Sequence, residues 1–369
     1  MYKRRSFIAA TAVALSVLLT GCGEQKQEAS AQAQPVEQEK ITWKMVTTWP
    51  KNFPGLGTGA NNLAELITEM SDGRLEVKVY GAGELVGALD VFDAVSRGTA
   101  ELGHGAGYYW KGKAPAGQFF AAVPFGLTAQ EMNGWIYNGG GLELWAEAYE
   151  PFGIIPMPAG NTGVQMGGWF NKEINTIGDL EGLKMRIPGL GGEVLKRAGG
   201  TPVLLPGGEI FPSLQSGAID ATEWVGPYND LAFGLHKAAK YYYYPGWHEP
   251  GTTLEALINK DAFEKLPKDL QSIVLGATRI ANADMLAEFT ARNNAALESL
   301  VGEHKVALRP YPAEVLSQLQ VLADQVVAEQ AEVDAISKKV YDSYKSFRDQ
   351  AIDWHAISEQ SMLNARNPQ

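Results

Sequence analysis

The feature of this sequence that most constrains its fold is an alternation of strand and helix patterns that runs twice along the chain. Ile41–Thr48 alternates like a strand, Ala60–Met70 carries apolar residues at helical spacing, and Leu75–Tyr80 alternates again. A helix pattern at Leu89–Val95 and a short strand at Ala100–His104 complete a β-α-β-α-β run. Such a run predicts a sheet that is sandwiched by helices.

The same alternation restarts after residue 150. Strands are predicted at Ile154–Pro158 and Val164–Phe170, followed by a short helical turn at Ile177–Leu180. Further strands and helices are expected in alternation at Leu183–Ile187, Gly192–Ala198, Pro202–Leu205, Phe211–Gly217 and Ala221–Val225. A strand pattern at Leu254–Asn259 leaves open a return of the chain to the first lobe, and amphipathic helical patterns fill most of the remainder.

Two such runs predict an α/β fold with two lobes. About 330 residues follow the N-terminal segment described below, more than one hydrophobic core usually holds. We expect residues 41–150 to form a first lobe completed by part of 250–310, residues 151–250 to form a second lobe, and residues 311–369 to form C-terminal helices. Because ligands of such sheets bind beyond the carboxyl ends of the strands, the site is predicted in the cleft between the lobes.

The N-terminal segment predicts export. Residues 1–21 combine a basic start with a short apolar run, as in a secretory signal peptide, and Arg4-Arg5-Ser6-Phe7 partly matches a twin-arginine signal, so the export route stays open. The run ends in Leu19-Thr20-Gly21-Cys22, which resembles a lipoprotein signal with Cys22 as the lipidated residue. Residues 22–40 hold almost no bulky apolar side chain and are expected to be a disordered tether. We therefore predict a periplasmic, lipid-anchored protein.

Charge and cysteine content narrow the classes of partner and site. Removal of residues 1–21 takes away three basic residues and no acid, which changes the net charge from −11 to −14. A body of that charge repels nucleic acid and anionic membrane surfaces, so the lipid is the only expected link to a membrane. Cys22 is the only cysteine, which excludes an internal disulfide and a multi-cysteine metal site.

Three alternatives to a solute receptor stay open from the residues alone. Gly55–Ala60 matches the dinucleotide-binding fingerprint, with Glu76 about 20 residues further on, but a loop with two prolines separates it from the preceding strand. An exported enzyme acting on a small carboxylate is the second alternative, although the five histidines form no HExxH motif and no Gly-x-Ser-x-Gly occurs. His248-Glu249 is the best remaining catalytic candidate, and we expect it to line the cleft instead. A purely structural partner module is the third.

Three stretches, taken in their order and spacing, carry a family resemblance. They are Gly107-Tyr108-Tyr109-Trp110-Lys111-Gly112-Lys113, Asn161–Phe170 and Asp220–Tyr228, supported by Gly182–Ile187 and Tyr241–Trp247. Together they resemble the solute-binding proteins of tripartite ATP-independent periplasmic (TRAP) transporters, in particular the subgroup that binds 2-oxo monocarboxylates such as pyruvate, or lactate with a metal ion. The resemblance extends from about Thr42 to the C-terminal helices. It implies a periplasmic-binding-protein-like fold, a receptor rather than an enzyme, and membrane permease subunits as partners.

The resemblance also implies roles for individual residues. Arg186, at the end of a predicted strand, corresponds to the arginine that clamps the substrate carboxylate through two parallel charge-assisted bonds. The side chains of Gln165 and Glu223, with the Trp224 carbonyl, are expected to hold Na⁺ or Ca²⁺, because oxygen donors suit a hard cation. Besides Arg186, contacts to the substrate are expected from Asn161, Tyr108, Tyr109, Gln165, Glu223, Trp224 and Trp247. A homodimer is possible, but the apolar stripe of the C-terminal helix is expected to pack on its own chain.

Overall fold

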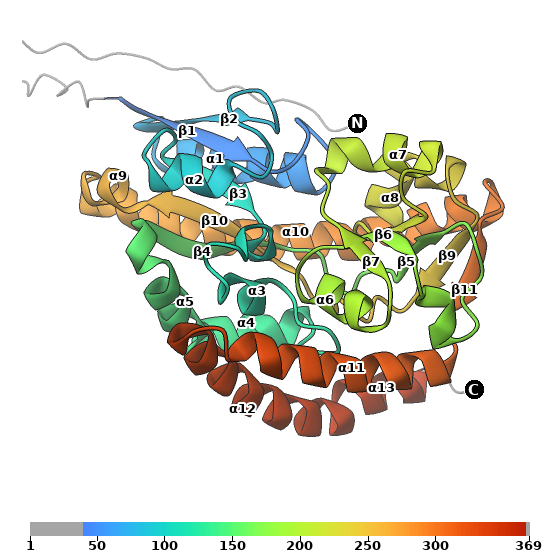
Figure 1. Cartoon of the computed structure of the whole chain (residues 1–369). Coiled ribbons are helices and arrows are strands. Elements are labelled where there is room, and N and C mark those ends of the chain that lie inside the picture. The colour runs from blue at the N-terminus through green and yellow to red at the C-terminus, as the bar shows by residue number, and fades with distance from the viewer. Residues whose placement is uncertain (1–39, 367–369) are drawn as a thin grey trace, which may run out of the picture. The chain divides into compact units, whose positions relative to one another are not determined.

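The computed structural model describes residues 40–366 as an α/β protein with two sheets (Figure 1). The predicted signal peptide, Cys22 and all of the tether but its last residue lie outside the described residues. Within the described range the alternation of strands and helices confirms the fold class, while the assignment of strands to sheets differs from the prediction at one point.

The first sheet has five strands in the order β2-β1-β3-β10-β4. Their bounds are β1 Ile41–Thr47, β2 Leu75–Tyr80, β3 Leu102–Gly105, β4 Ile154–Asn161 and β10 Thr253–Asn259. The first three strands are parallel, as the β-α-β pattern predicts, whereas β10 runs antiparallel to both of its neighbours. The predicted return of the chain near Leu254 to the first lobe is therefore confirmed.

The assignment of Ile154–Pro158 to the second lobe is wrong. This segment is part of β4, which pairs with β10 along its length in the first sheet. The sequence pattern identified a strand, but a period of two residues fixes only the faces of a strand and leaves its partner open. The chain thus leaves the first sheet after Asn161, not near residue 150.

The second sheet has six strands in the order β11-β9-β5-β8-β6-β7. Their bounds are β5 Gly168–Phe170, β6 Lys184–Arg186, β7 Thr201–Val203, β8 Ala221–Thr222, β9 Tyr241–Tyr244 and β11 Ala307–Pro310. The strands β6 and β8 are parallel neighbours, with Arg186 opposite Thr222. This register places the residues that follow both strands at the same edge of the sheet.

Helices cover the sheets and fill the connections (Figure 1). Around the first sheet they are α1 Leu56–Met70, α2 Val91–Ser96, η1 Gly107–Trp110, α3 Gly117–Ala121, α4 Ala129–Asn138, α5 Gly141–Tyr149, η2 Glu150–Phe152 and α9 Lys260–Glu264. Along the second sheet they are η3 Ile177–Leu180, α6 Gly189–Arg197, α7 Gly207–Ser216, α8 Pro227–Phe233 and η4 Leu235–Lys237. The long helix α10, Lys268–Gly302, packs against β4 and α1 and also against α8, so it bridges the two lobes.

The glycines of the dinucleotide-like motif have a packing role. Gly55 adopts a φ of 70° directly before α1, so the helix begins inside the motif rather than after it. A Cβ at Gly57 would lie 2.6 Å from the Pro50 carbonyl oxygen, and one at Gly59 would collide with Met285 of α10. The motif therefore permits a tight turn and a close approach of α1 to α10.

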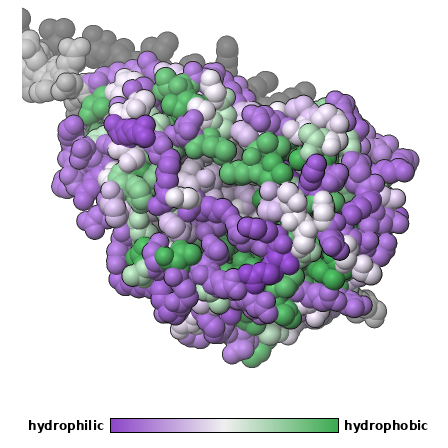
Figure 2. Space-filling model, in the orientation of Figure 1, coloured by the Kyte–Doolittle hydropathy of each residue, from purple (hydrophilic) through white to green (hydrophobic). Residues whose placement is uncertain are grey.

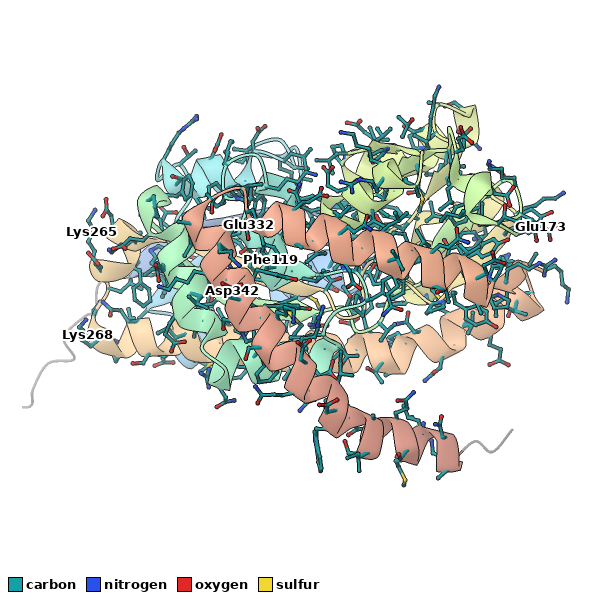
Figure 3. The ribbon with its side chains drawn as sticks, turned by 60° about the horizontal axis from the view of Figure 1, so that its bottom comes forward. Phe119, Glu173, Lys265, Lys268, Glu332 and Asp342 are labelled. Carbon is teal, nitrogen blue, oxygen red and sulfur yellow. The ribbon has the colours of Figure 1, made fainter. Side chains whose placement is uncertain are left out.

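The C-terminal helices cross both lobes. They are α11 Ala313–Ala331, α12 Ala335–Ile357 and α13 Glu359–Arg366, and Figure 3 shows the bend between α11 and α12 near Glu332. Val315 and Leu319 of α11 pack in the core of the second lobe, whereas Val340 and Tyr344 of α12 are fully buried against helices of the first. The central part of the apolar stripe thus packs on its own chain, as expected.

The last turns of the chain are less covered. Trp354 and Ile357 are 62% and 73% exposed, and α13 has no buried residue. Elsewhere the face shown in Figure 2 is mostly hydrophilic, with separate hydrophobic groups. Among residues 40–366, no helix is both long enough and apolar enough to cross a membrane.

Candidate functional site

The candidate site lies where the carboxyl ends of strands from both sheets meet. Arg186 is the last residue of β6 and Glu223 follows β8, while η1 follows β3 and carries Tyr108 and Tyr109. A backbone hydrogen bond of 3.2 Å from the Glu223 amide to the Arg186 carbonyl fixes the two strand ends side by side. The predicted positions of these four residues at strand ends are confirmed.

The Arg186 guanidinium is buried and surrounded by specific partners. Its Nη1 donates to Glu223 Oε1 in a short ion pair, its Nη2 donates to the Tyr109 hydroxyl at 3.2 Å, and its Nε donates to the Leu205 carbonyl at 3.3 Å. The Trp224 ring lies 5.1 Å from its central carbon. Burial alone would lower the pKa of Arg186, but the charge of Glu223 raises it above its ordinary value. Arg186 is therefore a fixed buried cation that faces the interface of the lobes.

A cluster of acids and a histidine lies beside this ion pair. Glu223, His248 and Glu249 place ligand atoms within 4.8 Å of one another, and all three residues are buried. His248 Nε2 is 3.5 Å from Glu223 Oε2. Burial, and next the charge of Glu223, raise the pKa of the Glu249 carboxyl to about 7. The prediction that His248 and Glu249 line the cleft agrees with this placement.

Gln165 reaches the cluster from a loop, not from a strand. The prediction of a strand from Val164 is wrong, because regular pairing begins only at Gly168. The intervening residues cross from the first sheet to the second, and Gly168 turns the chain with a φ of 116°. Gln165 Nε2 donates to Glu249 Oε2 at 2.7 Å and to Thr252 Oγ1 at 3.0 Å. The amide is thus oriented by the segment between β9 and β10.

Several buried polar atoms around the cluster are not satisfied by the chain itself. Gln165 Oε1, Glu223 Oε2 and both ring nitrogens of His248 have no hydrogen-bond partner among the described residues. An unpartnered buried oxygen costs free energy, so groups of this kind need an explanation. Two such oxygens next to further carboxylate oxygens match the donor set that Na⁺ or Ca²⁺ prefers. The residues present therefore fit the predicted cation.

The aromatic side chains close the site on several sides. Burial raises the pKa of Tyr108 and Tyr109, so both hydroxyls keep their protons and can donate hydrogen bonds. Trp49 and Trp224 meet edge to face at 6.2 Å, and Trp49 is held by a 2.7 Å hydrogen bond to His104. Exclusion of water by these rings strengthens polar contacts inside the site.

Asn161 has its hydrogen bonds away from the cluster, whereas Trp247 borders it. Asn161 donates to Thr253 Oγ1 at 3.2 Å and accepts from the Gly163 amide at 2.8 Å, so its side chain ties the end of β4 to β10. Trp247 meets His248 edge to face at 5.4 Å, and it also stacks on Phe125 at 6.0 Å in the core of the second lobe. Conversely, Thr252 was not predicted, and only its proximity in sequence to Glu249 pointed to it.

The chain resembles known proteins over nearly its whole length. A family model described as bacterial extracellular solute-binding protein, family 7 (DctP), matches residues 45–334. A monocarboxylate 2-oxoacid-binding periplasmic protein of Nostoc sp. is 46% identical over 362 residues, which cover 98% of each chain.

Solved structures show the same similarity. A TRAP periplasmic solute-binding protein of Pseudoalteromonas atlantica with bound sodium and pyruvate is 44% identical, with a TM-score of 0.86 over 88% of this chain and 99% of that chain. One of Colwellia psychrerythraea with bound calcium and pyruvate is 42% identical, with a TM-score of 0.86 over 89% of this chain and 100% of that chain.

Proposed function

Because this chain belongs to family 7 of the bacterial extracellular solute-binding proteins, the DctP receptors of TRAP transporters, we propose that it captures a small 2-oxo monocarboxylate together with Na⁺ or Ca²⁺. The observation that carries the proposal is the buried Arg186 at the lobe interface, next to buried oxygens of Gln165 and Glu223 that lack a partner among residues 40–366. The family consists of transport receptors rather than enzymes, so the enzyme alternative is dropped.

Arg186 is the anchor for the substrate carboxylate. A guanidinium can donate two parallel hydrogen bonds to a carboxylate, and its pairing with Glu223 keeps its position fixed before the ligand arrives. The Tyr109 hydroxyl, 3.2 Å from Nη2, lies within reach of the same carboxylate. A 2-hydroxy acid such as lactate offers the same carboxylate, so the oxo or hydroxyl group must be distinguished by the remaining donors and the cation.

Gln165, Glu223 and the Trp224 carbonyl would hold the cation. When bound, the ion supplies positive charge that offsets Glu223 and attracts oxygens of the acid. The chain contributes side-chain oxygens that are already buried, so little ordering accompanies binding. Because acid and cation share this site, each should raise the affinity of the other by the same factor.

Ligand entry requires the lobes to separate. Arg186 and Glu223 are 1% and 0% exposed, and contacts between the lobes enclose them. These contacts include a 2.7 Å ion pair between Lys111 and Glu193, and stacking of Phe53 on Phe233 at 4.2 Å. We expect a hinge motion that opens these contacts. Small-angle scattering should give a smaller radius of gyration with acid and cation than without them; equal radii would contradict the motion.

Calorimetry on the purified chain tests the proposed function. We expect pyruvate or a longer 2-oxo acid to bind in the presence of Na⁺ or Ca²⁺, and nicotinamide nucleotides not to bind. Thermal unfolding should shift upward in parallel, since ligand at 100 times Kd adds about 2.7 kcal/mol of stability. The absence of binding with every 2-oxo and 2-hydroxy monocarboxylate tried would refute the proposal.

A conservative variant tests the anchor. Arg186→Lys keeps the charge beside Glu223 but loses the planar fork, so acid affinity should fall by a factor of about thirty or more. Arg197→Lys is the matched control, because Arg197 forms an exposed ion pair with Glu329 away from the site. Equal affinity in the two variants would remove Arg186 from the site.

The location in the periplasm follows the family, and we further propose that Cys22 carries the lipid that anchors the chain to a membrane. The signal-like segment that ends at Cys22 supports the anchor. At the membrane, the partners of the chain would be the permease subunits of a TRAP transporter. Replacement of Cys22 by alanine should move the protein from the detergent phase to the aqueous phase; unchanged partition would refute the anchor.

A homodimer would use the exposed Trp354 and Ile357. Sedimentation that gives a mass near 80 kDa, about twice the 39.9 kDa chain, would reveal it.

A further inference from the structure

We propose that Tyr149 and Glu255, two buried residues of the first lobe outside the site itself, are positioning residues for the receptor. Through the Trp110 indole they hold η1 so that the Tyr109 hydroxyl meets Arg186. This inference rests on the proposed function and deepens it, because it names what places one of the contacts to the substrate carboxylate.

A network of three buried side chains connects η1 to the core of the first lobe. Trp110, the last residue of η1, donates from its indole Nε1 to the Tyr149 hydroxyl at 2.9 Å, and that hydroxyl lies 3.3 Å from Glu255 Oε1. Tyr149 is the last residue of α5, and Glu255 lies in β10. All three side chains are buried. The network therefore ties η1 to a helix and a strand that do not reach the site.

Three glycines bring the backbone into close contact with this network. A Cβ at Gly117 would lie 2.7 Å from the Tyr149 hydroxyl, and one at Gly105 would lie 2.5 Å from the Trp110 ring. The backbone of Gly107, the first residue of η1, packs at the same place. A Cβ there would lie 2.4 Å from the Gly117 carbonyl oxygen and 3.3 Å from the Tyr149 hydroxyl. Because the packing leaves no free space, a shift of the hydroxyl or of the indole has to move η1 itself.

The same short helix carries contacts from the first lobe to the second. The Tyr109 hydroxyl accepts from Arg186 Nη2 at 3.2 Å, and Lys111, directly after η1, pairs with Glu193 at 2.7 Å. Trp110 lies between Tyr109 and Lys111 in the sequence, so a shift of Trp110 moves both neighbours. The position of the Trp110 indole thus sets where the Tyr109 hydroxyl meets the buried guanidinium when the lobes are together.

Glu255 acts in this network as a neutral hydrogen-bonding group rather than as a charge. Burial raises the pKa of its carboxyl to about 8, and the groups that oppose this rise are the Tyr149 hydroxyl and the Trp110 and Trp145 indoles, none of which is charged. A buried acid with neutral partners keeps its proton at neutral pH. Glu255→Gln therefore keeps a neutral hydrogen-bonding group of similar size, whereas Glu255→Leu removes it.

Calorimetry with pyruvate, in buffer that contains both Na⁺ and Ca²⁺, tests the network through a double-mutant cycle. Tyr149→Phe removes only the hydroxyl, and we expect the affinity for pyruvate to fall about fivefold or more. Tyr109→Phe removes the contact with Arg186 and should lower the affinity by about tenfold. Because Tyr149 acts through Tyr109, the double variant should bind no more than about threefold more weakly than Tyr109→Phe alone.

Tyr344→Phe is the matched control for the loss of a buried hydroxyl. The Tyr344 hydroxyl is also fully buried, but it accepts from the Leu127 amide at 2.8 Å and makes no hydrogen bond to η1. The affinity of this variant for pyruvate should stay within about twofold of the wild type. Glu255→Gln should stay within about threefold of the wild type at neutral pH, whereas Glu255→Leu should bind about as weakly as Tyr149→Phe. A merely structural role would lower the stability of these variants without changing their affinities.

The outcomes separate this inference from the proposed function. A wild-type protein that binds no 2-oxo acid refutes both. If the wild type binds, equal affinities in Tyr149→Phe and Tyr344→Phe overturn the positioning role alone. Effects of Tyr149→Phe and Tyr109→Phe that multiply in the double variant overturn it as well. Should Tyr149→Phe fail to fold, Trp110→Phe takes its place in the cycle, because it removes the donor of the same hydrogen bond, and the same two results decide.

Discussion

The ion pair between Arg186 and Glu223 predicts a strong energetic coupling in the ligand-free protein, because both residues lie at the ends of neighbouring strands of the second sheet and stay paired when the lobes separate. Both side chains are almost fully buried in the closed structure, and each neutralises the other. Replacement of one partner leaves a buried charge without compensation, which costs about 3–5 kcal/mol of unfolding free energy. We therefore expect Arg186→Met and Glu223→Gln each to be severely destabilised before any ligand is added.

The double variant should be far less affected than the two single changes predict. With both charges gone, the remaining losses are the bonds from Arg186 to Tyr109 and Leu205, at about 1 kcal/mol each. The double variant should thus be no less stable than either single variant. This implies a coupling of at least about 3 kcal/mol, whereas independent sites add within about 0.5 kcal/mol.

Urea unfolding monitored by tryptophan fluorescence measures this cycle. Chelator and choline buffer keep cation and acid from restoring the missing charge. The exposed pair of Arg197 and Glu329 serves as control, and its cycle should give a coupling below about 1 kcal/mol. Additive effects at Arg186 and Glu223 would show that the pair is not buried in the ligand-free state, and the reasoning would fail.

Three further predictions concern pH, an anchoring hydrogen bond and the C-terminal helix. Burial raises the pKa of Glu255 from 4.5 to about 8, so the stability that it contributes is complete below pH 4.5 and is lost as the pH rises through 8. Between pH 5.5 and 7.5 the wild type should therefore lose up to about 3 kcal/mol more than Glu255→Gln in urea unfolding; identical slopes would contradict this. Tyr344→Phe removes a 2.8 Å hydrogen bond from the Leu127 amide and should lower the free energy of unfolding by about 1–3 kcal/mol. An unchanged melting temperature would contradict this prediction. Truncation after Ala331 should expose the surface that covers Val340 and cause aggregation, whereas a soluble monomer would show that α12 is dispensable.

The strand ends were the most predictable part of the site. Arg186 and Glu223 follow short strands with clear local patterns, and parallel neighbours bring their ends together regardless of the rest of the fold. The resemblance to the family then assigned their roles. Local pattern and topology agree at these two positions, which is why the sequence was sufficient there.

The sequence was insufficient where one strand pattern fits more than one partner. Ile154–Asn161 has the apolar character of a buried strand, and its place in the first sheet depends on pairing with β10, nearly a hundred residues away. Gln165 was predicted to lie in a strand because apolar residues surround it in the sequence. In the structure it lies in the connection between β4 and β5, where the chain crosses from one sheet to the other and forms no strand pairing. The choice between partners is made by tertiary packing, which periodicity does not record.

The roles of His248 and Glu249 show a different limit. These residues form no spaced motif, so the sequence offered them only as neighbours of an aromatic residue. Their burial, which only the structure shows, is what marks them as candidate site residues. A buried acid that forms no ion pair with lysine or arginine requires a cation, a proton or a bound group.

The unpaired atoms in the closed site also suggest why ligand and closure belong together. Without acid and cation, closure buries the oxygens of Gln165 and Glu223 without partners from residues 40–366, which opposes the contacts between the lobes. Those contacts are modest: a partly exposed ion pair from Lys111 to Glu193, and aromatic rings that meet edge to face or stack. A bound acid and cation would satisfy the buried atoms only when the lobes are together. Their binding free energy is therefore different in the two states, and that difference is what can shift the population toward closure.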